Sequence, residues 1–260
     1  MRTLCGTVLA AVCAVFSCNA EVVRDIQYDS SIDRFGLGDL FLPDAGNGGQ
    51  GTYPPSEASR RRRCPSRGGS GPVPLVLTIH GGGWSSGDRA SWEGVARFFT
   101  EQLGFAAFNI EYRLASVSNR WPACGNDCVN AARFVLSDEF KKRFSLSHDK
   151  IWICGGSAGG HLALWTLTHL PVGDVAGCIS ISAIGDPVLD HAVHAGRYKT
   201  LFGEAAGKRL AAMDPRKAIV PGMAPILCTH AAEDKVVPLT SHKAFANAYR
   251  SAGNVCEFFE

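Results

Sequence analysis

Ser157 stands in the pentapeptide GGSAG at 155–159, between the apolar run at 151–154 and a second apolar run at 161–165. This order predicts a strand, a tight turn and a helix. Glycines allow the backbone to turn sharply without a Cβ clash, and the turn would leave the Ser157 hydroxyl at the carboxyl end of the strand, next to the partly positive start of the helix. The chemistry that this arrangement favours is nucleophilic attack by serine on an acyl carbon.

A glycine turn lies upstream, in the sequence HGGGW at 80–84, directly after the apolar run at 75–79. Alone, such a turn is often only a flexible connection. Combined with the serine turn, its backbone N–H groups are suited to stabilise a developing oxyanion. We predict that the amides of Gly82, Gly83 and Ala158 form the oxyanion hole, with Trp84 as an alternative donor.

With these motifs the chain resembles the α/β-hydrolase superfamily, in particular the secreted carboxylesterase branch with its feruloyl and acetyl-xylan esterase-like proteins. The resemblance covers residues 73–260 and is carried, in the family's order, by HGGGW at 80–84, EYRL at 111–114, WPACGNDC at 121–128, GGSAGGHLAL at 155–164 and HAAEDKVVP at 230–238. It implies an α/β fold with a mostly parallel central sheet and helices on both faces. It also implies a serine hydrolase that cleaves small carboxylic esters through an acyl-enzyme, with no cofactor and no metal.

The resemblance implies that Asp234 is the catalytic acid, which holds and stabilises the imidazole of the general base. Glu233 is the competing carboxylate. The family's order places the catalytic histidine after one further strand, here predicted at 255–259, and the sequence reaches only Glu260. We therefore expect the base to lie beyond Glu260, which would make the fold C-terminally incomplete and this chain nearly inactive.

The histidines inside the chain have other expected roles. We expect His80 and His161 to be scaffold residues of the two motifs and His242 to point along the surface, while His230 is a weaker alternative base. The pair at 191 and 194 has a spacing that could hold a metal ion. Without a third ligand, it is expected to be a solvated polar face.

The segment 186–220 fits a strand and helix alternation poorly. In related esterases it forms part of the acyl or alcohol pocket, so the resemblance makes His191, His194, Tyr198 and Phe202 candidates for substrate contact. Trp84 is a further candidate, from the oxyanion motif. Packing is the alternative role, and it is favoured for the side chains of segment 186–220.

The first 20 residues are typical of an export signal, with Arg2, an apolar run at 7–16 and cleavage expected after Ala20. Acylation of Cys18 is the alternative, so we expect a secreted or periplasmic protein without a stable membrane span. The hydrolase domain would occupy 21–260. It would contain a disordered insertion at 44–73, because that stretch is rich in Gly, Pro, Ser and Arg.

The composition suits one globular enzyme domain, with 260 residues of which 46% are hydrophobic and 19% charged. A net charge of +2 is too small to indicate a nucleic-acid partner. Cys154, Cys178 and Cys228 fall in predicted core strands. Cys124 and Cys128 could form a disulfide if the chain there is not regular helix, or remain free thiols.

The expected strands are near 22–28, 38–42, 75–80, 105–110, 150–154, 176–182, 225–230 and 255–259, and the expected helices are near 91–103, 126–143, 158–169 and 240–251.

The predicted substrate is a small-molecule or polysaccharide-linked ester. Two other functions remain open: a non-catalytic hydrolase-like binding protein, and a serine peptidase or amide hydrolase on the same fold. The sequence does not indicate an oligomeric state.

Overall fold

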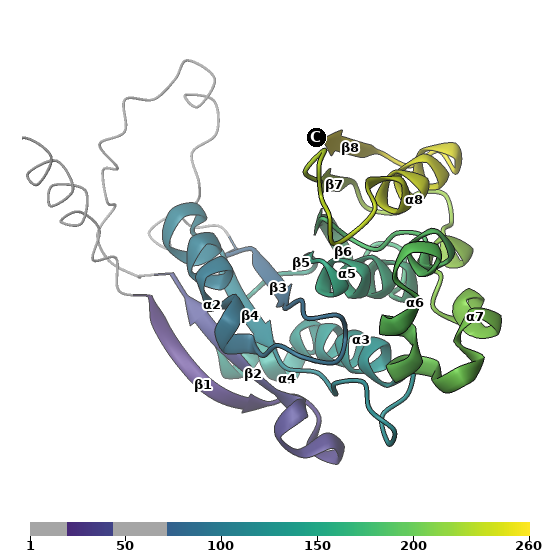
Figure 1. Ribbon diagram of the computed structural model, residues 1–260. Helices are drawn as coiled ribbons and strands as arrows, with labels where there is room; N and C mark the ends of the chain where they lie inside the picture. Colours follow the sequence, from purple (N-terminus) through teal and green to yellow (C-terminus); the bar gives the residue numbers. More distant parts are fainter. Residues whose placement is uncertain (1–19, 44–71) are drawn as a thin grey trace, which may run out of the picture.

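The computed structural model describes residues 20–43 and 72–260 (Figure 1). The predicted export signal, the acylation of Cys18 and nearly all of the predicted insertion lie outside the described residues. Within them, no helix is both long enough and apolar enough to cross a membrane.

One sheet of eight strands forms the centre of the molecule, in the order β1-β2-β4-β3-β5-β6-β7-β8. Its strands β1 and β2 are antiparallel to their neighbours, and all pairs from β4 to β8 are parallel. The bounds are β1 Glu21–Gln27, β2 Leu37–Leu42, β3 Leu75–Ile79, β4 Ala106–Ile110, β5 Ile151–Gly156, β6 Val175–Ile181, β7 Ile226–Thr229 and β8 Cys256–Phe259. All eight strands were predicted within two residues, and the mostly parallel sheet is confirmed.

Helices cover both faces of this sheet, as predicted. On one face lie α2 (Arg89–Arg97) and the π-helix η3 (Phe98–Gln102), whose Ala96 and Phe99 pack with Val76 of β3. The opposite face carries α3 (Ala123–Leu136), α5 (Ala158–His169) and α8 (Leu239–Ser251), which share the larger core. Because β3 and β4 are covered on both faces, all of their residues are buried.

The prediction of a single helix over 126–143 is wrong, because the chain breaks at Ser137. This residue is extended (φ −68°, ψ 149°) and its hydroxyl accepts the N–H of Phe140, which starts the new helix α4 (Asp138–Arg143). A side-chain acceptor at such a position satisfies one of the free N–H groups of the first turn. Likewise, the predicted helix 91–103 is divided between α2 and η3.

The segment that did not fit the alternation is mostly helical. It contains α6 (Pro187–Phe202), η4 (Gly203–Ala205), α7 (Ala206–Arg209), η5 (Leu210–Ala212) and η6 (Pro215–Ala218). The carboxylate of Asp186 caps α6 by accepting the N–H groups of Val188 and Leu189. The remaining element, η1 (Ser30–Gly36), connects β1 to β2.

Cys124 and Cys128 lie in the regular helix α3 and are buried free thiols, so the disulfide alternative is not realised. Cys154, Cys178 and Cys228 are buried in core strands, as predicted.

Candidate active site

Ser157 lies in the turn between β5 and α5, at the carboxyl end of a central strand, as predicted. Its backbone has φ 57° and ψ −122°, a combination that residues with a Cβ rarely adopt and that costs about 1–3 kcal/mol. The turn is held by two hydrogen bonds, from the Ser157 N–H to the Ile181 carbonyl at 2.8 Å and from the His161 N–H to the Ser157 carbonyl at 3.1 Å. Such strain, fixed by its surroundings, is typical of a nucleophile elbow.

The glycines around Ser157 are required by close backbone packing. A Cβ on Gly155 would lie 2.2 Å from the Gly159 carbonyl oxygen, and a Cβ on Gly159 would lie 2.3 Å from the carbonyl oxygen of Ile79. Both distances are shorter than any stable carbon–oxygen contact. Helix α5 can therefore approach the end of β3 only because these positions have no side chain.

The glycine turn after β3 passes directly beside Ser157. A Cβ on Gly81 would lie 3.4 Å from the Ser157 Cβ. Gly82 and Gly83 have positive φ angles of 118° and 58°, and a Cβ on Gly83 would meet nothing within 4 Å. The backbone at Gly83 thus borders open space, while Ala158 contributes one of the free N–H groups of the first turn of α5.

Two buried side chains join the glycine turn to α5. The Trp84 indole donates to Nδ1 of His161 at 3.3 Å, and Nε2 of His161 bonds the Met213 carbonyl at 2.8 Å. The carbonyl can only accept, so His161 carries its proton on Nε2 and is neutral. Complete burial lowers the pKa of His161 to about 4, which keeps this connection intact near neutral pH.

His80 also holds the glycine turn in place. Its Nδ1 bonds the Gly81 carbonyl at 2.7 Å, its ring stacks on Tyr112 at 4.2 Å, and the Tyr112 hydroxyl donates to the His80 carbonyl at 3.0 Å. The predicted scaffold roles of His80 and His161 are therefore confirmed.

Asp234 lies in the loop after β7, on the same edge of the sheet as Ser157, and its Oδ1 accepts the N–H groups of Val236 at 2.7 Å and Val237 at 3.0 Å. Burial alone would raise the pKa of Asp234. The two N–H groups and the Ser182 hydroxyl outweigh that effect, so the pKa lies below its usual value. Asp234 is therefore a fixed, ionised carboxylate, whereas the competing Glu233 is exposed.

A buried chain of hydrogen bonds leads from β6 to this loop. Nε2 of His230 bonds the Val237 carbonyl at 3.0 Å, Nδ1 of His230 bonds Nδ1 of His242 at 3.1 Å, and Nε2 of His242 bonds the Ser180 hydroxyl at 3.1 Å. The expectation that His242 points along the surface is wrong, since its side chain is completely buried.

When both imidazoles are neutral, the Val237 carbonyl determines where every proton in this series of hydrogen bonds lies. The Val237 carbonyl requires a proton on Nε2 of His230, which leaves Nδ1 of His230 as an acceptor. His242 must then donate from Nδ1 and accept at Nε2 from the Ser180 hydroxyl. Burial lowers the pKa of His242 to about 3, in agreement with a neutral ring.

The BD-FAE family matches residues 64–171, the part of the chain that holds both glycine motifs. Versiconal hemiacetal acetate esterase of Aspergillus parasiticus is 31% identical over 122 residues, which are 47% of this chain and 36% of that protein. Carboxylic ester hydrolase LipN of Mycobacterium tuberculosis is 32% identical over 111 residues, 42% of this chain and 28% of the relative. These matches span about a third of the relatives' length.

Solved structures extend the likeness to nearly the whole fold. A truncated carbohydrate esterase from gut microbiota aligns with a TM-score of 0.74 at 17% identity, over 94% of this chain and 88% of the other. The chain has the α/β-hydrolase fold. It resembles the esterases of that superfamily, as the sequence motifs predicted.

Three of the five side chains predicted to contact substrate lie in the core of this fold, whereas His191 and His194 are partly exposed. Trp84 and Tyr198 are completely buried and Phe202 is 4% exposed. The Trp84 indole N–H is used by His161, and the Tyr198 hydroxyl donates to Asp190 at 2.8 Å. Their burial favours packing, the alternative role that the sequence left open. A contact with substrate stays a prediction.

The sequence did not reveal how α6 holds the loop after β7 that carries Asp234, which we call the acid loop. Arg197 donates to the Val236 carbonyl at 2.9 Å and forms an ion pair with buried Asp190 at 3.3 Å. A kink at His194 (φ −131°, ψ 48°) interrupts the helix between these partners, so regular helical spacing could not have indicated the pair. Among the described residues, 20–43 and 72–260, no group of three or more His, Cys, Asp or Glu side chains is arranged to hold a metal ion.

Proposed function

We propose that this chain carries the nucleophile, the oxyanion hole and the acid of a carboxylic ester hydrolase that uses a serine mechanism. The observation that carries this proposal is the strained backbone of Ser157 (φ 57°, ψ −122°) with the glycine turn beside it, 3.4 Å between the Ser157 Cβ and a Cβ position on Gly81. Ser157 is one of six described residues other than glycine with a positive φ angle. Strain at a serine that lies beside the glycine turn has a clear use in acyl transfer.

In the proposed reaction the Ser157 hydroxyl attacks the ester carbonyl and the N–H groups of Gly82, Gly83 and Ala158 stabilise the tetrahedral oxyanion. Asp234 orients the imidazole that takes the serine proton. The alcohol leaves with that proton, and water then hydrolyses the acyl-enzyme. Backbone donors of an oxyanion hole contribute on the order of 10²–10³-fold to turnover.

Six of the eight histidines are weak candidates for the general base, because at least one ring nitrogen of each already has a partner elsewhere. His80 and His161 hold the glycine turn and His230 and His242 hold the acid loop, as described above. His148 bonds the Val135 carbonyl and His169 the Trp165 carbonyl. His230 is the nearest to Asp234, with 3.5 Å between Nε2 and Oδ2, yet its Nε2 proton is directed at Val237.

We propose that the base is a histidine that follows Glu260 in the natural reading frame. Strand β8 runs parallel to β7 and pairs Phe259 with Thr229, so residues after β8 would emerge at the edge of the sheet that holds Asp234. On the face of α2, Ile179, Ile181 and Leu227 are only partly buried and Phe259 is 57% exposed. A following segment could cover them.

The test compares the 260-residue chain with a version extended along its reading frame. We expect the extended protein to hydrolyse p-nitrophenyl acetate, and the shorter chain to retain only the roughly 10³–10⁴-fold acceleration over water that remains without a triad member. Ser157→Ala is the control in both. Robust Ser157-dependent turnover by the shorter chain would instead assign the base to one of its own histidines.

For the substrate we propose acyl groups on a carbohydrate, supported by the likeness to a carbohydrate esterase that shares the fold. A panel of acetylated xylan oligosaccharide, simple acetate esters and peptide amides tests this choice. Preferential cleavage of the amides would favour a peptidase. No Ser157-dependent turnover of any of the three by the extended protein would favour a binding protein. Export to the cell exterior stays a prediction from residues 1–20.

A further inference from the structure

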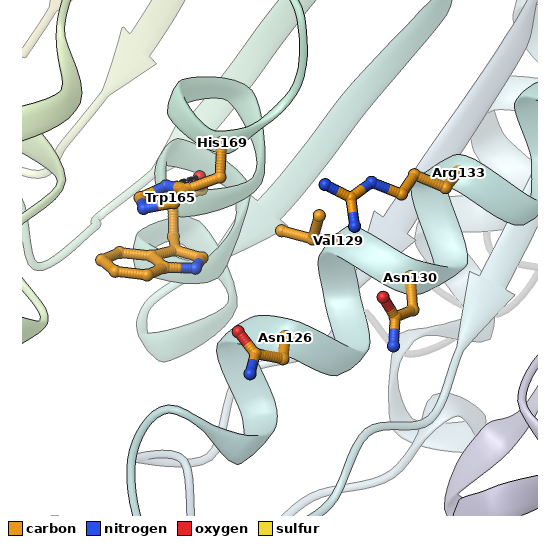
Figure 2. A pocket seen from close by; sticks show the side chains of 6 residues that line it. All are labelled: Asn126, Val129, Asn130, Arg133, Trp165 and His169. Carbon is orange, nitrogen blue, oxygen red and sulfur yellow. Dashed lines mark hydrogen bonds between the residues drawn. The ribbon is translucent and has the colours of Figure 1, made fainter.

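A cavity of about 320 Å³ lies between α3 and α5 (Figure 2). The lining residues on α3 are three or four positions apart and so lie on one face of that helix. Helix α5 contributes two residues one turn apart. The cavity is lined by Asn126, Val129, Asn130, Arg133, Trp165 and His169. Trp165 is eight residues after Ser157 on α5, which at 1.5 Å per residue is roughly 12 Å along the helix. The cavity is therefore separate from the candidate active site.

The indole of Trp165 has an unused hydrogen-bond donor here. The residue is only 9% exposed, and its Nε1 is buried with no hydrogen-bond partner among the described residues. Figure 2 shows the side of the ring that carries Nε1 turned toward α3 and Asn126. A Cβ on Gly125 would lie 2.9 Å from this nitrogen, so the space in front of the donor exists because residue 125 is glycine. An unsatisfied buried donor costs about 1–3 kcal/mol.

The other polar groups of the cavity give it an excess of donors and one positive charge. Arg133 is exposed, and within 20–43 and 72–260 no carboxylate forms an ion pair with it. In Figure 2 its guanidinium reaches toward the space between the two helices. The amides of Asn126 and Asn130 can donate and accept, although Asn130 also donates to Asp29 at 3.3 Å. No carboxylate lines the cavity.

The apolar part of the cavity is formed by Val129 and by the pair of stacked rings. His169 lies over Trp165 with ring centroids 3.7 Å apart and an interplanar angle of 21°. Its Nδ1 bonds the Trp165 carbonyl at 2.8 Å, so in the neutral ring Nε2 is an acceptor. The volume is at the lower end of the range for small-molecule sites, about 300–1,000 Å³.

We propose that this cavity binds a hydroxylated monocarboxylate, with a uronic acid sugar as the chemical class. The Arg133 guanidinium would pair with the carboxylate in the two-pronged geometry that this group favours. The Trp165 N–H and the two amides would bond hydroxyl oxygens, and Val129 would contact the C–H face of the ring. This proposal does not depend on ester hydrolysis.

The experiment titrates the purified chain with glucuronate, glucose and acetate at constant ionic strength, by calorimetry and by tryptophan fluorescence. We expect glucuronate to bind with a Kd on the order of 1 mM, equivalent to about −4 kcal/mol, and glucose and acetate at least tenfold more weakly. Arg133→Gln should weaken glucuronate binding at least tenfold. Trp165→Phe keeps an aromatic ring, removes the N–H donor and reduces the stacked surface, and should weaken glucuronate binding several-fold.

Two further variants separate binding from folding. Gly125→Ala fills the space before the indole nitrogen and should reduce glucuronate binding without a change in polar groups. Arg143→Gln removes an exposed arginine on α4 and should have no effect. Circular dichroism checks the fold of each variant. Glucuronate binding that Arg133→Gln leaves unchanged would overturn the proposal, and so would acetate binding as tight as glucuronate binding, because the cavity would then be a simple anion site.

Discussion

The packing of α5 against the end of β3 can be tested with a single methyl group, in Gly159→Ala. In a helix interior, alanine is favoured over glycine by about 0.5–1 kcal/mol, so helix propensity alone predicts a more stable protein. The structure predicts the opposite. The added Cβ would lie 2.3 Å from the Ile79 carbonyl oxygen and 2.4 Å from that of His80, and these are backbone atoms that cannot rotate away.

Overpacking of this kind typically costs about 1–3 kcal/mol. Subtracting the gain in propensity, we expect Gly159→Ala to lower the free energy of unfolding by roughly 1–2 kcal/mol. In the extended protein it should also reduce esterase turnover, because relief of the clash must move Ser157 relative to the glycine turn. The assays are urea unfolding followed by circular dichroism and p-nitrophenyl acetate hydrolysis.

Gly94→Ala is the matched control. Gly94 is exposed inside α2, and a Cβ there would meet nothing within 4 Å, so the control should gain about 0.5–1 kcal/mol. A Gly159→Ala protein as stable as the native chain, with the control behaving as expected, would refute the close-packing explanation of the elbow.

Three other predictions concern strain, protonation and a buried hydrogen bond. Ser157→Gly should be more stable than Ser157→Ala by about 1 kcal/mol, because glycine adopts φ 57° without a Cβ penalty; equal urea midpoints would mean that the elbow stores no strain. His161 and His242 have folded-state pKa values of about 4 and about 3, below the ordinary value of about 6.5 in the unfolded chain. Stability should therefore fall as the pH drops below about 6.5, by roughly 2 kcal/mol per histidine between pH 7 and 5, and a flat series of urea midpoints would contradict their burial as neutral rings. Tyr198→Phe removes the donor to buried Asp190 and should cost about 1–3 kcal/mol, measured by the same unfolding assay, and a cost near zero would show that the bond is replaced.

The sequence predicted the strands and the two glycine motifs well because both signals are local. Short apolar runs mark the strands, and the glycines mark turns where no Cβ fits. Helix ends were less predictable. The break at Ser137 depends on one hydroxyl that caps the next helix. The π-helix after Arg97 has no amino-acid pattern that distinguishes it from the α-helix before it.

The side chains around the acid loop could not be placed by motif alone. His242 was expected on the surface, yet it shares a helical stripe with Phe245, Ala246 and Tyr249, all buried. That spacing of three, four and seven residues was a usable signal of a core face. No comparable signal exists for its contact with His230, because the geometry of β7 and α8 alone brings the two rings together.

The hydrogen-bond chain of Ser180, His242 and His230 also has a direction. With neutral rings, each O–H or N–H points from β6 toward the acid loop, so the three bond dipoles add and polarise one another. The positive end of this array is the N–H group at Nε2 of His230, whose nitrogen lies 3.5 Å from Oδ2 of Asp234. A row of uncharged groups thus provides a favourable electrostatic potential for the ionised Asp234, the proposed catalytic acid. It introduces no buried net charge whose desolvation the fold would have to offset.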